Sequence, residues 1–296
     1  SVLEPQARLA VRSVEDLVGL VPYLIGFHPE ESLVVVVLQE GRVVVTARVD
    51  LAAVAGARYV DADVEEPNGH LFLPSKEMTI DPVEVLVPVV DEARCTACRE
   101  CVDFCRFNAL AMINDRVAVF EQVCTSCGGC TVLCPEGAIS EKRRLIGHLQ
   151  QGQADGVEVR TGVMLPGVVS GVPILSRLLA GLPDDDLSII DGPPGASCLV
   201  VETARVADLC LLVAEPTLFG IHNLRMIRQL LRSVGRPGGL LINKALDDGP
   251  RLEEVAAELE LPVLGRLPYD PEIARATAEG RLLVRESAQV REVMEG

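Results

Sequence analysis

The sequence predicts an α/β fold in which helices flank a mainly parallel sheet and a cysteine-rich module is inserted. Short aliphatic runs alternate with amphipathic helical patterns through most of the chain, the order expected of parallel strands joined by helices. Eight of the ten cysteines form two copies of one pattern in the middle of the chain. Hydrophobic residues make up 49% and charged residues 24% of the sequence, which is enough for a folded core.

The N-terminal part, residues 1–56, is interpreted as a small α/β unit. A helix start is expected at Ser13, the aliphatic run Leu33 to Leu38 predicts a strand, and Arg42 to Val49 predicts its hairpin partner. The stretch from Val21 to Leu33 resembles the opening of an uncharacterised bacterial protein family, and this resemblance names no chemistry.

From Ala57 onward the pattern changes to units of a strand followed by a helix. Expected strands are Arg58–Val60, Leu187–Ile190, Leu209–Val213, Gly239–Ile242 and Val263–Leu264, with helices at Leu224–Ser233 and Leu252–Leu259. The carboxyl ends of parallel strands meet at one edge of a sheet, so the polar residues that follow these strands are expected to share a crevice. The predicted domains are therefore a core of residues 57–89 and 141–296 and an inserted module of residues 90–140.

The two cysteine runs have the spacing of iron–sulfur ligands. They are Cys95-x-x-Cys98-x-x-Cys101-x-x-x-Cys105 and Cys124-x-x-Cys127-x-x-Cys130-x-x-x-Cys134-Pro135. Three thiolates at two-residue intervals wrap around one cluster, and the fourth cysteine of such a run ligates the other cluster. The sequence therefore predicts two 4Fe–4S clusters, one on Cys95, Cys98, Cys101 and Cys134 and one on Cys124, Cys127, Cys130 and Cys105.

Two other uses of these cysteines were weighed. Zinc sites normally combine two C-x-x-C pairs across a longer loop, and a third cysteine at the same short interval argues against them. A disulfide framework suits a short secreted chain, whereas this one has 296 residues and no secretory signal. Reduced cysteines in a cytoplasmic protein agree better with the sequence.

Charge and hydropathy exclude further classes. A formal charge of −16 and a pI near 4.7 oppose nucleic-acid binding, which needs lysines and arginines to displace counterions. The longest aliphatic run, Leu33 to Leu38, is far shorter than the roughly 20 residues of a membrane helix, so no membrane insertion is expected. The first residue is Ser1 rather than methionine, which is compatible with a fragment or a processed product.

Ordered matches over residues 57–296 point to a known superfamily. The segments are VDADVEEPNGHLFL (60–73), CVDFCRFNAL (101–110), CGGCTVLCPEGAI (127–139), IDGPPGASC (190–198), EPTLFGIH (215–222) and LGRLPYD (264–270). Together they resemble the MinD/ParA-like P-loop ATPases that carry an inserted ferredoxin domain. The resemblance implies a parallel-sheet core of the P-loop NTPase (SIMIBI) type, incomplete at its N-terminus, an inserted α+β ferredoxin-like domain with two clusters, and a homodimer.

The same resemblance assigns positions for a nucleotide. It places Asp61 and Asp63 on the side of the metal and the hydrolytic water, makes Asp191 the Walker-B-type carboxylate, and puts Asn243 opposite the adenine. However, no G-x-x-x-x-G-K-S/T phosphate loop occurs in the sequence, so the amide cradle and the lysine for the phosphates are missing. Binding of ATP and magnesium, and ATPase activity, are therefore expected to be lost.

The sequence is compatible with several functions. The leading hypothesis is an electron-transfer protein with two 4Fe–4S clusters, acting on an unidentified redox partner. The alternatives are a carrier that delivers a cluster to a client protein, an ATP-dependent regulator of the MinD/Mrp type, and a truncated or misjoined gene product. The acidic charge suggests a partner with a basic patch.

The remaining cysteines, histidines and acidic runs are expected to be structural. Cys198 and Cys210 adjoin aliphatic strands and should pack as small apolar side chains. No histidine has the spacing of a metal site, and a run of aspartates before a strand is normally a hydrated loop. These residues are His28, His70, His148, His222 and Asp184, Asp185 and Asp186.

Overall fold

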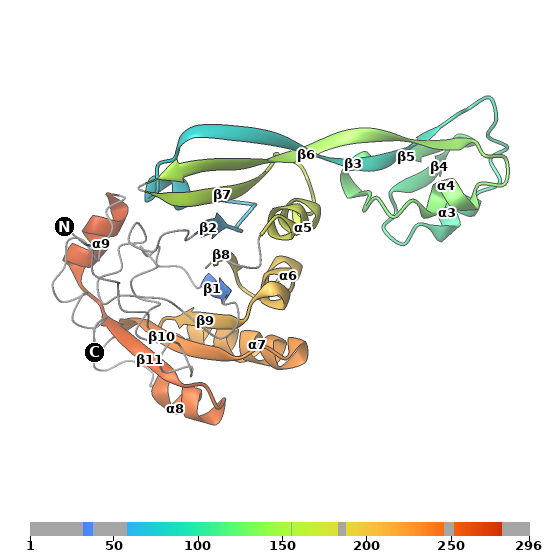
Figure 1. The fold of residues 1–296 in the computed structure, drawn as a ribbon. Helices are drawn as coiled ribbons and strands as arrows, with labels where there is room; N and C mark the ends of the chain where they lie inside the picture. Colours follow the sequence, from blue (N-terminus) through green and yellow to red (C-terminus); the bar gives the residue numbers. More distant parts are fainter. Residues whose placement is uncertain (1–31, 38–57, 155, 183–187, 246–251, 280–296) are drawn as a thin grey trace.

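The chain folds around one long, mixed sheet that is largely parallel (Figure 1). The computed structural model describes residues 32–37, 58–154, 156–182, 188–245 and 252–279. Within these ranges nine strands form one sheet in the order β11-β10-β9-β1-β8-β2-β7-β6-β3, and β4 and β5 form a separate hairpin. β1 and β6 run opposite to the other strands of the large sheet. The predicted mixed α/β class is thus confirmed.

The strands are β1 (Ser32–Val37), β2 (Arg58–Asp61), β3 (Lys76–Val90), β4 (Leu110–Ile113), β5 (Arg116–Val119), β6 (Ile139–Ala154), β7 (Val157–Met164), β8 (Ser188–Pro194), β9 (Leu209–Ala214), β10 (Gly238–Ala245) and β11 (Val263–Pro268). The α-helices are α3 (Glu100–Phe104), α4 (Gly129–Leu133), α5 (Val172–Ala180), α6 (Cys198–Val206), α7 (Leu218–Val234), α8 (Leu252–Glu258) and α9 (Pro271–Ala278). Short 3-10 helices cover Gly69–Leu71 and Glu121–Val123.

Helices α5, α6 and α7 lie side by side on one face of the sheet (Figure 1). α7 shows why such a segment is helical, because its buried residues Leu224, Ile227 and Leu231 recur at intervals of three and four. The helix begins after Thr217, whose hydroxyl oxygen accepts the N–H of Gly220 at 2.9 Å, and it ends at a left-handed Gly235. Within the described ranges, no helix combines the length and apolar character needed to span a bilayer.

Most of the predicted core elements are present. β2, β8, β9, β10, β11, α7 and α8 all overlap the runs that predicted them. The predicted strand at Leu33 to Leu38 is also present as β1, but it lies inside the main sheet, antiparallel to both β8 and β9. The helix start at Ser13 and the hairpin partner at Arg42 to Val49 lie outside the described residues.

Strands β3 and β6 extend beyond the sheet as a two-stranded arm (Figure 1). β6 pairs with β7 only from Gly147 onward, so its first half is paired with β3 alone. The ladder between Glu84–Val90 and its partners spans roughly 20 Å at about 3.3 Å per residue. A register shift between Val83 and Glu84 marks the point where the arm leaves the sheet, and the guanidinium of Arg177 on α5 donates to the Pro82 carbonyl there at 2.7 Å.

The cysteine segment lies at the far end of this arm and has its own small core. Its buried members are Cys101, Leu110, Cys130 and Ile139, and they form a cluster apart from the large core under α5, α6 and α7. A core of this size contributes only part of the stability of a segment of about 50 residues, and small scaffolds of this kind commonly add a cross-link or a metal.

Substituting Gly147 with alanine should weaken the base of the arm. An added Cβ would clash with the carbonyl oxygen of Val163 and with the side chain of Ile174. The carbonyl cannot move away easily, because Val163 belongs to β7, which is paired with β6. Overpacking of this kind costs about 1–3 kcal/mol, measurable as a lower midpoint of urea unfolding. Ser140→Ala, on an exposed position of the same strand, is the control and should stay within about 0.5 kcal/mol. An unchanged midpoint for the Gly147 variant would contradict the packing described.

Candidate iron–sulfur centres

The module is built from two copies of one local structure. In each half a cysteine loop leads into a short helix, α3 or α4, and then to a strand. The backbone is left-handed at matching positions, at Ala97 and Ser126 and again at Arg99 and Gly128. Non-glycine residues in this region cost about 1–3 kcal/mol each and persist at sites where the conformation serves a purpose. Turns that alternate right- and left-handed residues direct successive N–H groups inward and form concavities for anions, including iron–sulfur clusters.

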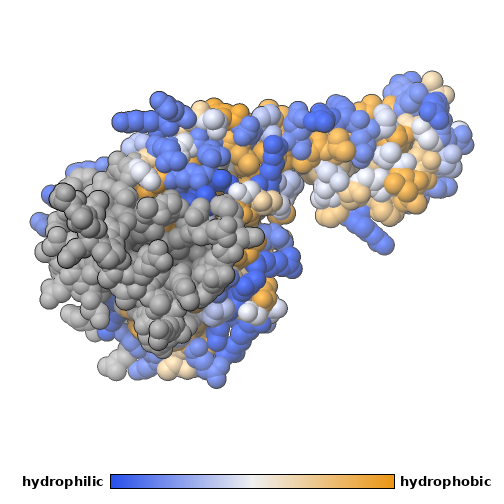
Figure 2. Space-filling view, viewed as in Figure 1, coloured by the Kyte–Doolittle hydropathy of each residue, from blue (hydrophilic) through white to orange (hydrophobic). Residues whose placement is uncertain are grey.

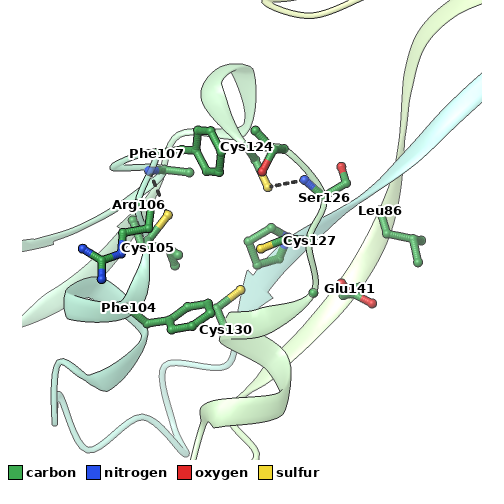
Figure 3. A pocket seen from close by; sticks show the side chains of 15 residues that line it. Leu86, Phe104, Cys105, Arg106, Phe107, Cys124, Ser126, Cys127, Cys130 and Glu141 are labelled. Atoms are coloured by element: carbon green, nitrogen blue, oxygen red, sulfur yellow. Dashed lines mark hydrogen bonds between the residues drawn. The ribbon is translucent and has the colours of Figure 1, made fainter. Parts of the chain in front are cut away.

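The first set of cysteines, called site B here, comprises Cys105, Cys124, Cys127 and Cys130. All four line one cavity of about 180 Å³ (Figure 3). Three of them come from the second cysteine run, and Cys105 comes from the first. A cavity of this size has room for on the order of ten water-sized groups.

The second set, called site A, comprises Cys95, Cys98, Cys101 and Cys134. These four also line one cavity, which is smaller, at about 20 Å³. Cys134 here comes from the second run, so the fourth cysteine of each run lies in the cavity of the other. The two groupings coincide with those assigned from the spacing. Site A leaves room for only one or two water-sized groups, so its walls would have to move outward around a larger one.

Backbone amides donate hydrogen bonds to three of the thiol sulfurs. The N–H of Ala109 lies 3.3 Å from the Cys105 sulfur, and that of Ala138 lies 3.2 Å from the Cys134 sulfur. These two bonds are equivalent in the two halves. A third runs from Ser126 to Cys124 at 3.4 Å. Such donors stabilise negative charge on sulfur and are one of the means by which proteins set cluster potentials.

The cysteines differ in exposure within each set. Cys101 and Cys130 are buried, and burial raises the pKa of both thiols. Cys98 and Cys127, by contrast, are exposed. Each cavity thus has one buried and one exposed cysteine among the four that line it. Metal binding requires the thiolate, so the two buried thiols gain most from a positive centre beside them.

Each donor set offers four thiols, the number of protein ligands that a 4Fe–4S cluster takes. Among the described residues, no three Cys, His, Asp or Glu side chains are arranged to hold one metal ion. A 4Fe–4S cube binds each thiolate through a different iron, so its four ligands stand further apart than those of one zinc. Four thiols around a cavity, with amides directed at the sulfurs, match that requirement.

The other two cysteines lie in the body. Cys210 is buried in β9, where burial raises the pKa of its thiol to about 12, in agreement with a packing role. Cys198 is exposed at the start of α6, so the packing role predicted for it is wrong. The histidines are also dispersed: the His148 ring contacts the Gln150 amide at 3.0 Å, and no described histidine joins a metal-binding group. His28 and the run Asp184–Asp186 lie outside the described residues.

Two of the residues assigned to a nucleotide lie side by side at the carboxyl edge of the sheet. Asp61 on β2 and Asp191 on β8 are register partners. The Asp61 carboxylate accepts the N–H of Gly69 at 2.8 Å, and Asp191 accepts the hydroxyl of Tyr59 at 2.7 Å. Burial and the neighbouring Asp191 raise the pKa of Asp61 to about 7. The pKa of Tyr59 is raised as well, first by burial and then by the two aspartates.

The other two assigned residues are placed differently. Asp63 follows β2, is half-buried, and has a pKa raised mainly by burial. Asn243 is buried on β10, which β9, β1 and β8 separate from β2. The structure therefore brings Asp61 and Asp191 together and leaves Asn243 several strands away.

These residues do not fit a magnesium nucleotide. A metal ion between Asp61 and Asp191 would have to displace bonds already made to Gly69 and Tyr59. β1 runs opposite to β8 and β9, so its own carboxyl end lies at the other edge of the sheet and cannot lead into a phosphate loop here. Asp61 is buried and Asp191 is half-buried, and two neighbouring carboxylates repel the negative charge of phosphates.

Sequence reasoning missed five residues that shape these sites. Tyr59 and Gly69 complete the carboxylate network, and Phe104, Phe107 and Glu141 line the cavity of site B. Tyr59 lies two residues before Asp61 on a strand, so period-two alternation could have placed both on one face. Glu141 had no such signal, because its strand was not predicted.

The pH dependence of stability should change when Asp61 is replaced by asparagine. A carboxyl whose pKa rises from 3.8 to about 7 on folding binds more protons in the folded state, so its contribution to stability falls as pH rises through that interval. Asp61→Asn keeps an acceptor for Gly69 and removes the charge. We expect the variant to gain stability relative to the wild type, by on the order of a few kcal/mol, between pH 5 and pH 8.

Urea unfolding at both pH values measures this difference. Glu65→Gln, an exposed change in the same loop, serves as the control. If the free energy of unfolding changes with pH in the same way in the wild type and the Asp61 variant, Asp61 is charged in the folded state at both pH values. That outcome would contradict the raised pKa.

Three proteins of Methanocaldococcus jannaschii are similar in sequence. An uncharacterised protein is 23% identical over 229 residues, covering 76% of this chain and 80% of its own length. A second uncharacterised protein is 30% identical over 176 residues, covering 58% and 61%. An uncharacterised ATP-binding protein is 29% identical over 125 residues, covering 40% and 49%. The chain thus spans about half the length of this third relative, and ATP binding is a description of that protein.

Solved structures of cell-division proteins are similar at low identity. The septum site-determining protein MinD of Pyrococcus horikoshii, in complex with Mg-ADP, is 17% identical, with 83% of this chain and 84% of that chain covered and a TM-score of 0.47. The cell division ATPase MinD of Pyrococcus furiosus is 19% identical, with 81% and 83% covered and a TM-score of 0.46.

A family profile also matches the chain. The profile carries the description "Domain of unknown function (DUF4192)" and covers residues 15–171, more than half of the sequence. The matched range includes the stretch from Val21 to Leu33, β1, β2, the arm and both cysteine runs. The chain therefore belongs to the DUF4192 family.

Proposed function

We propose that this protein binds two 4Fe–4S clusters, at sites A and B, and passes single electrons between partners. One observation carries the proposal: each set of four cysteines, drawn crosswise from the two runs, lines a cavity of its own. When bound, each cluster supplies a centre that accepts and releases one electron.

The chain's own residues would set the environment of that centre. The amides of Ala109 and Ala138 hold the sulfurs of Cys105 and Cys134 by hydrogen bonds. At site B the Phe104 ring lies against Gly129, where any side chain would collide with it, so the glycine allows an aromatic wall close to the cysteines. Walls of this kind exclude water and lower the local dielectric.

The compartment and partners follow from the same chemistry. Thiols must remain reduced for cluster assembly, which favours the cytoplasm. A charge of −16 opposes nucleic acid and favours a basic protein partner. The homodimer expected from the resemblance stays a prediction. No nucleotide step is included, because the residues at the carboxyl edge do not fit one.

Two matched quadruple variants test the crosswise assignment. One keeps the site A cysteines and replaces Cys105, Cys124, Cys127 and Cys130 with serine. The other keeps the first run, Cys95, Cys98, Cys101 and Cys105, and replaces the second. Both retain four cysteines, but only the first retains a complete cavity. After anaerobic reconstitution we expect about eight irons and eight sulfides in the wild type, about four of each in the first variant, and far fewer in the second.

Iron and acid-labile sulfide assays, with electron paramagnetic resonance of the reduced protein, provide the measurement. Cys198→Ser is the control and should retain the full content. Equal iron and sulfide contents in the two quadruple variants would contradict the crosswise assignment. A colourless wild-type protein that contains zinc would contradict the cluster proposal itself.

A cluster carrier is the second candidate, and the exposure of Cys98 and Cys127 favours it. A ligand at the mouth of each cavity is accessible to an acceptor's thiols, so ligand exchange could begin there. A carrier should lose its iron to an apo-ferredoxin within minutes in the absence of chelator. An electron-transfer protein should retain its iron over repeated cycles of reduction and oxidation.

A further inference from the structure

We propose that site B, and not site A, is the end of the module at which a redox partner docks, and that this partner is a basic one-electron carrier protein with an exposed apolar edge to its redox centre. The inference rests on the proposed function. It concerns the surface that surrounds the cysteines rather than the ligands themselves.

The mouth of site B is lined by large apolar side chains. Leu86 is 46% exposed, Phe104 45% and Phe107 55%, and all three line the cavity beside the exposed Cys127. Figure 3 shows the two rings on either side of the sulfurs. Exposed aromatic residues around a pocket are typical of the centre of a protein interface.

The mouth of site A has a different character. Its exposed lining residues include Thr96, Arg99, Glu100 and Glu136. Glu136 occupies the position in the second half that Phe107 occupies in the first. Each site thus has four cysteines, but the side chains around the two mouths differ. A partner with an apolar contact patch fits only site B.

The apolar rim of site B is fixed in place. Phe104 lies against Gly129, the first residue of α4, and any side chain there would displace the ring. Leu86 stands on β3, within the paired arm. Figure 2 shows hydrophobic residues gathered along the arm and over α3 and α4. A fixed rim loses little side-chain entropy when a partner binds.

Charge decides the kind of partner. Next to the cavity, Arg143 pairs with Glu84 at 3.2 Å and Lys142 with Glu121 at 2.7 Å, so most local charges are already neutralised. Glu141 lines the cavity and makes no ion pair with any described residue. Arg106 lines the cavity on the side opposite Glu141, where its guanidinium can donate a hydrogen bond to a carbonyl or a carboxylate of a partner. The overall charge of −16 then steers a basic protein toward the molecule.

The electron step is simple. One electron leaves the reduced protein and enters the partner's centre, for example the ferric haem of cytochrome c, which becomes ferrous. No covalent bond forms or breaks, and no proton moves.

Cytochrome c is therefore the probe, since it is basic and exposes an apolar haem edge. The reconstituted full chain carries Phe107→Ser or, as a second variant, Leu86→Ser. Ile113→Ser is the control, because Ile113 is 50% exposed on the module but lines neither cavity. Isothermal titration measures the Kd for ferric cytochrome c with the oxidised protein. Stopped-flow absorbance then measures the rate of haem reduction by the reduced protein, with ferricyanide as a small acceptor that needs no docked surface.

We expect Phe107→Ser and Leu86→Ser each to raise the Kd and to lower the haem reduction rate by about tenfold, as for residues at the centre of an interface. The ferricyanide rate and the Ile113 variant should stay within about twofold. An unchanged Kd in both rim variants, or equal loss with ferricyanide, would overturn the docking surface. A wild-type dimer that dissociates in the rim variants would instead assign the surface to a second copy.

Iron and sulfide are counted in every sample, which separates the two proposals. Full loading with an unchanged Kd defeats the docking surface and leaves the clusters in place. A wild type that takes up no iron defeats both.

Discussion

The antiparallel pairing of β3 with β6 is the interaction on which the cysteine module depends. It returns the chain at Ile139 to the strand that it left at Val90, and so it closes the intervening segment into a loop. Only then can Cys105 and Cys134 each reach the opposite half. The ladder also sets the distance of both sites from the body, because α5 holds its base through the bond from Arg177 to the Pro82 carbonyl. The grouping of the cysteines therefore depends on the closure of the chain by the arm.

Several features of the module are each unfavourable on their own. All of them would become favourable around a cofactor that combines metal cations with negatively charged sulfur. Burial raises the pKa of the Cys101 and Cys130 thiols, Ala97 and Arg99 hold left-handed backbones, and the separate core is small. In the proposed function, bound iron would offset the cost of burying thiolates, and backbone N–H groups of the cysteine loops would face the negative charge on sulfur. Local conflicts that share one resolution are a stronger indication of a site than any one of them alone.

The sequence predicted most of the buried strands, because their aliphatic runs are a local signal. It also predicted which cysteines line the same cavity, whereas their role as cluster ligands stays a prediction. β3 was missed since Pro82 and Pro88 interrupt it, a register shift breaks its alternation, and only a few of its residues, such as Val83 and Val87, are buried. β1 shows another limit. Its aliphatic run predicts a strand, but nothing in such a run selects antiparallel partners in β8 and β9. The bond from Tyr59 to Asp191 likewise depends on a cross-strand register that the sequence does not contain.

The two aspartates at the carboxyl edge of the main sheet are accommodated independently of the cysteine module. A buried Asp61 beside a half-buried Asp191 would be costly without hydrogen bonds, but Gly69 and Tyr59 donate to these carboxylates, and the raised pKa of Asp61 allows a proton to replace its charge. Both carboxylates thus have hydrogen-bond donors within the chain itself. The arm carries both cysteine sites outside the main sheet. A protein partner can then cover the rim formed by Leu86, Phe104 and Phe107 without touching the carboxylates, so binding at the module and the stability of the body can vary independently.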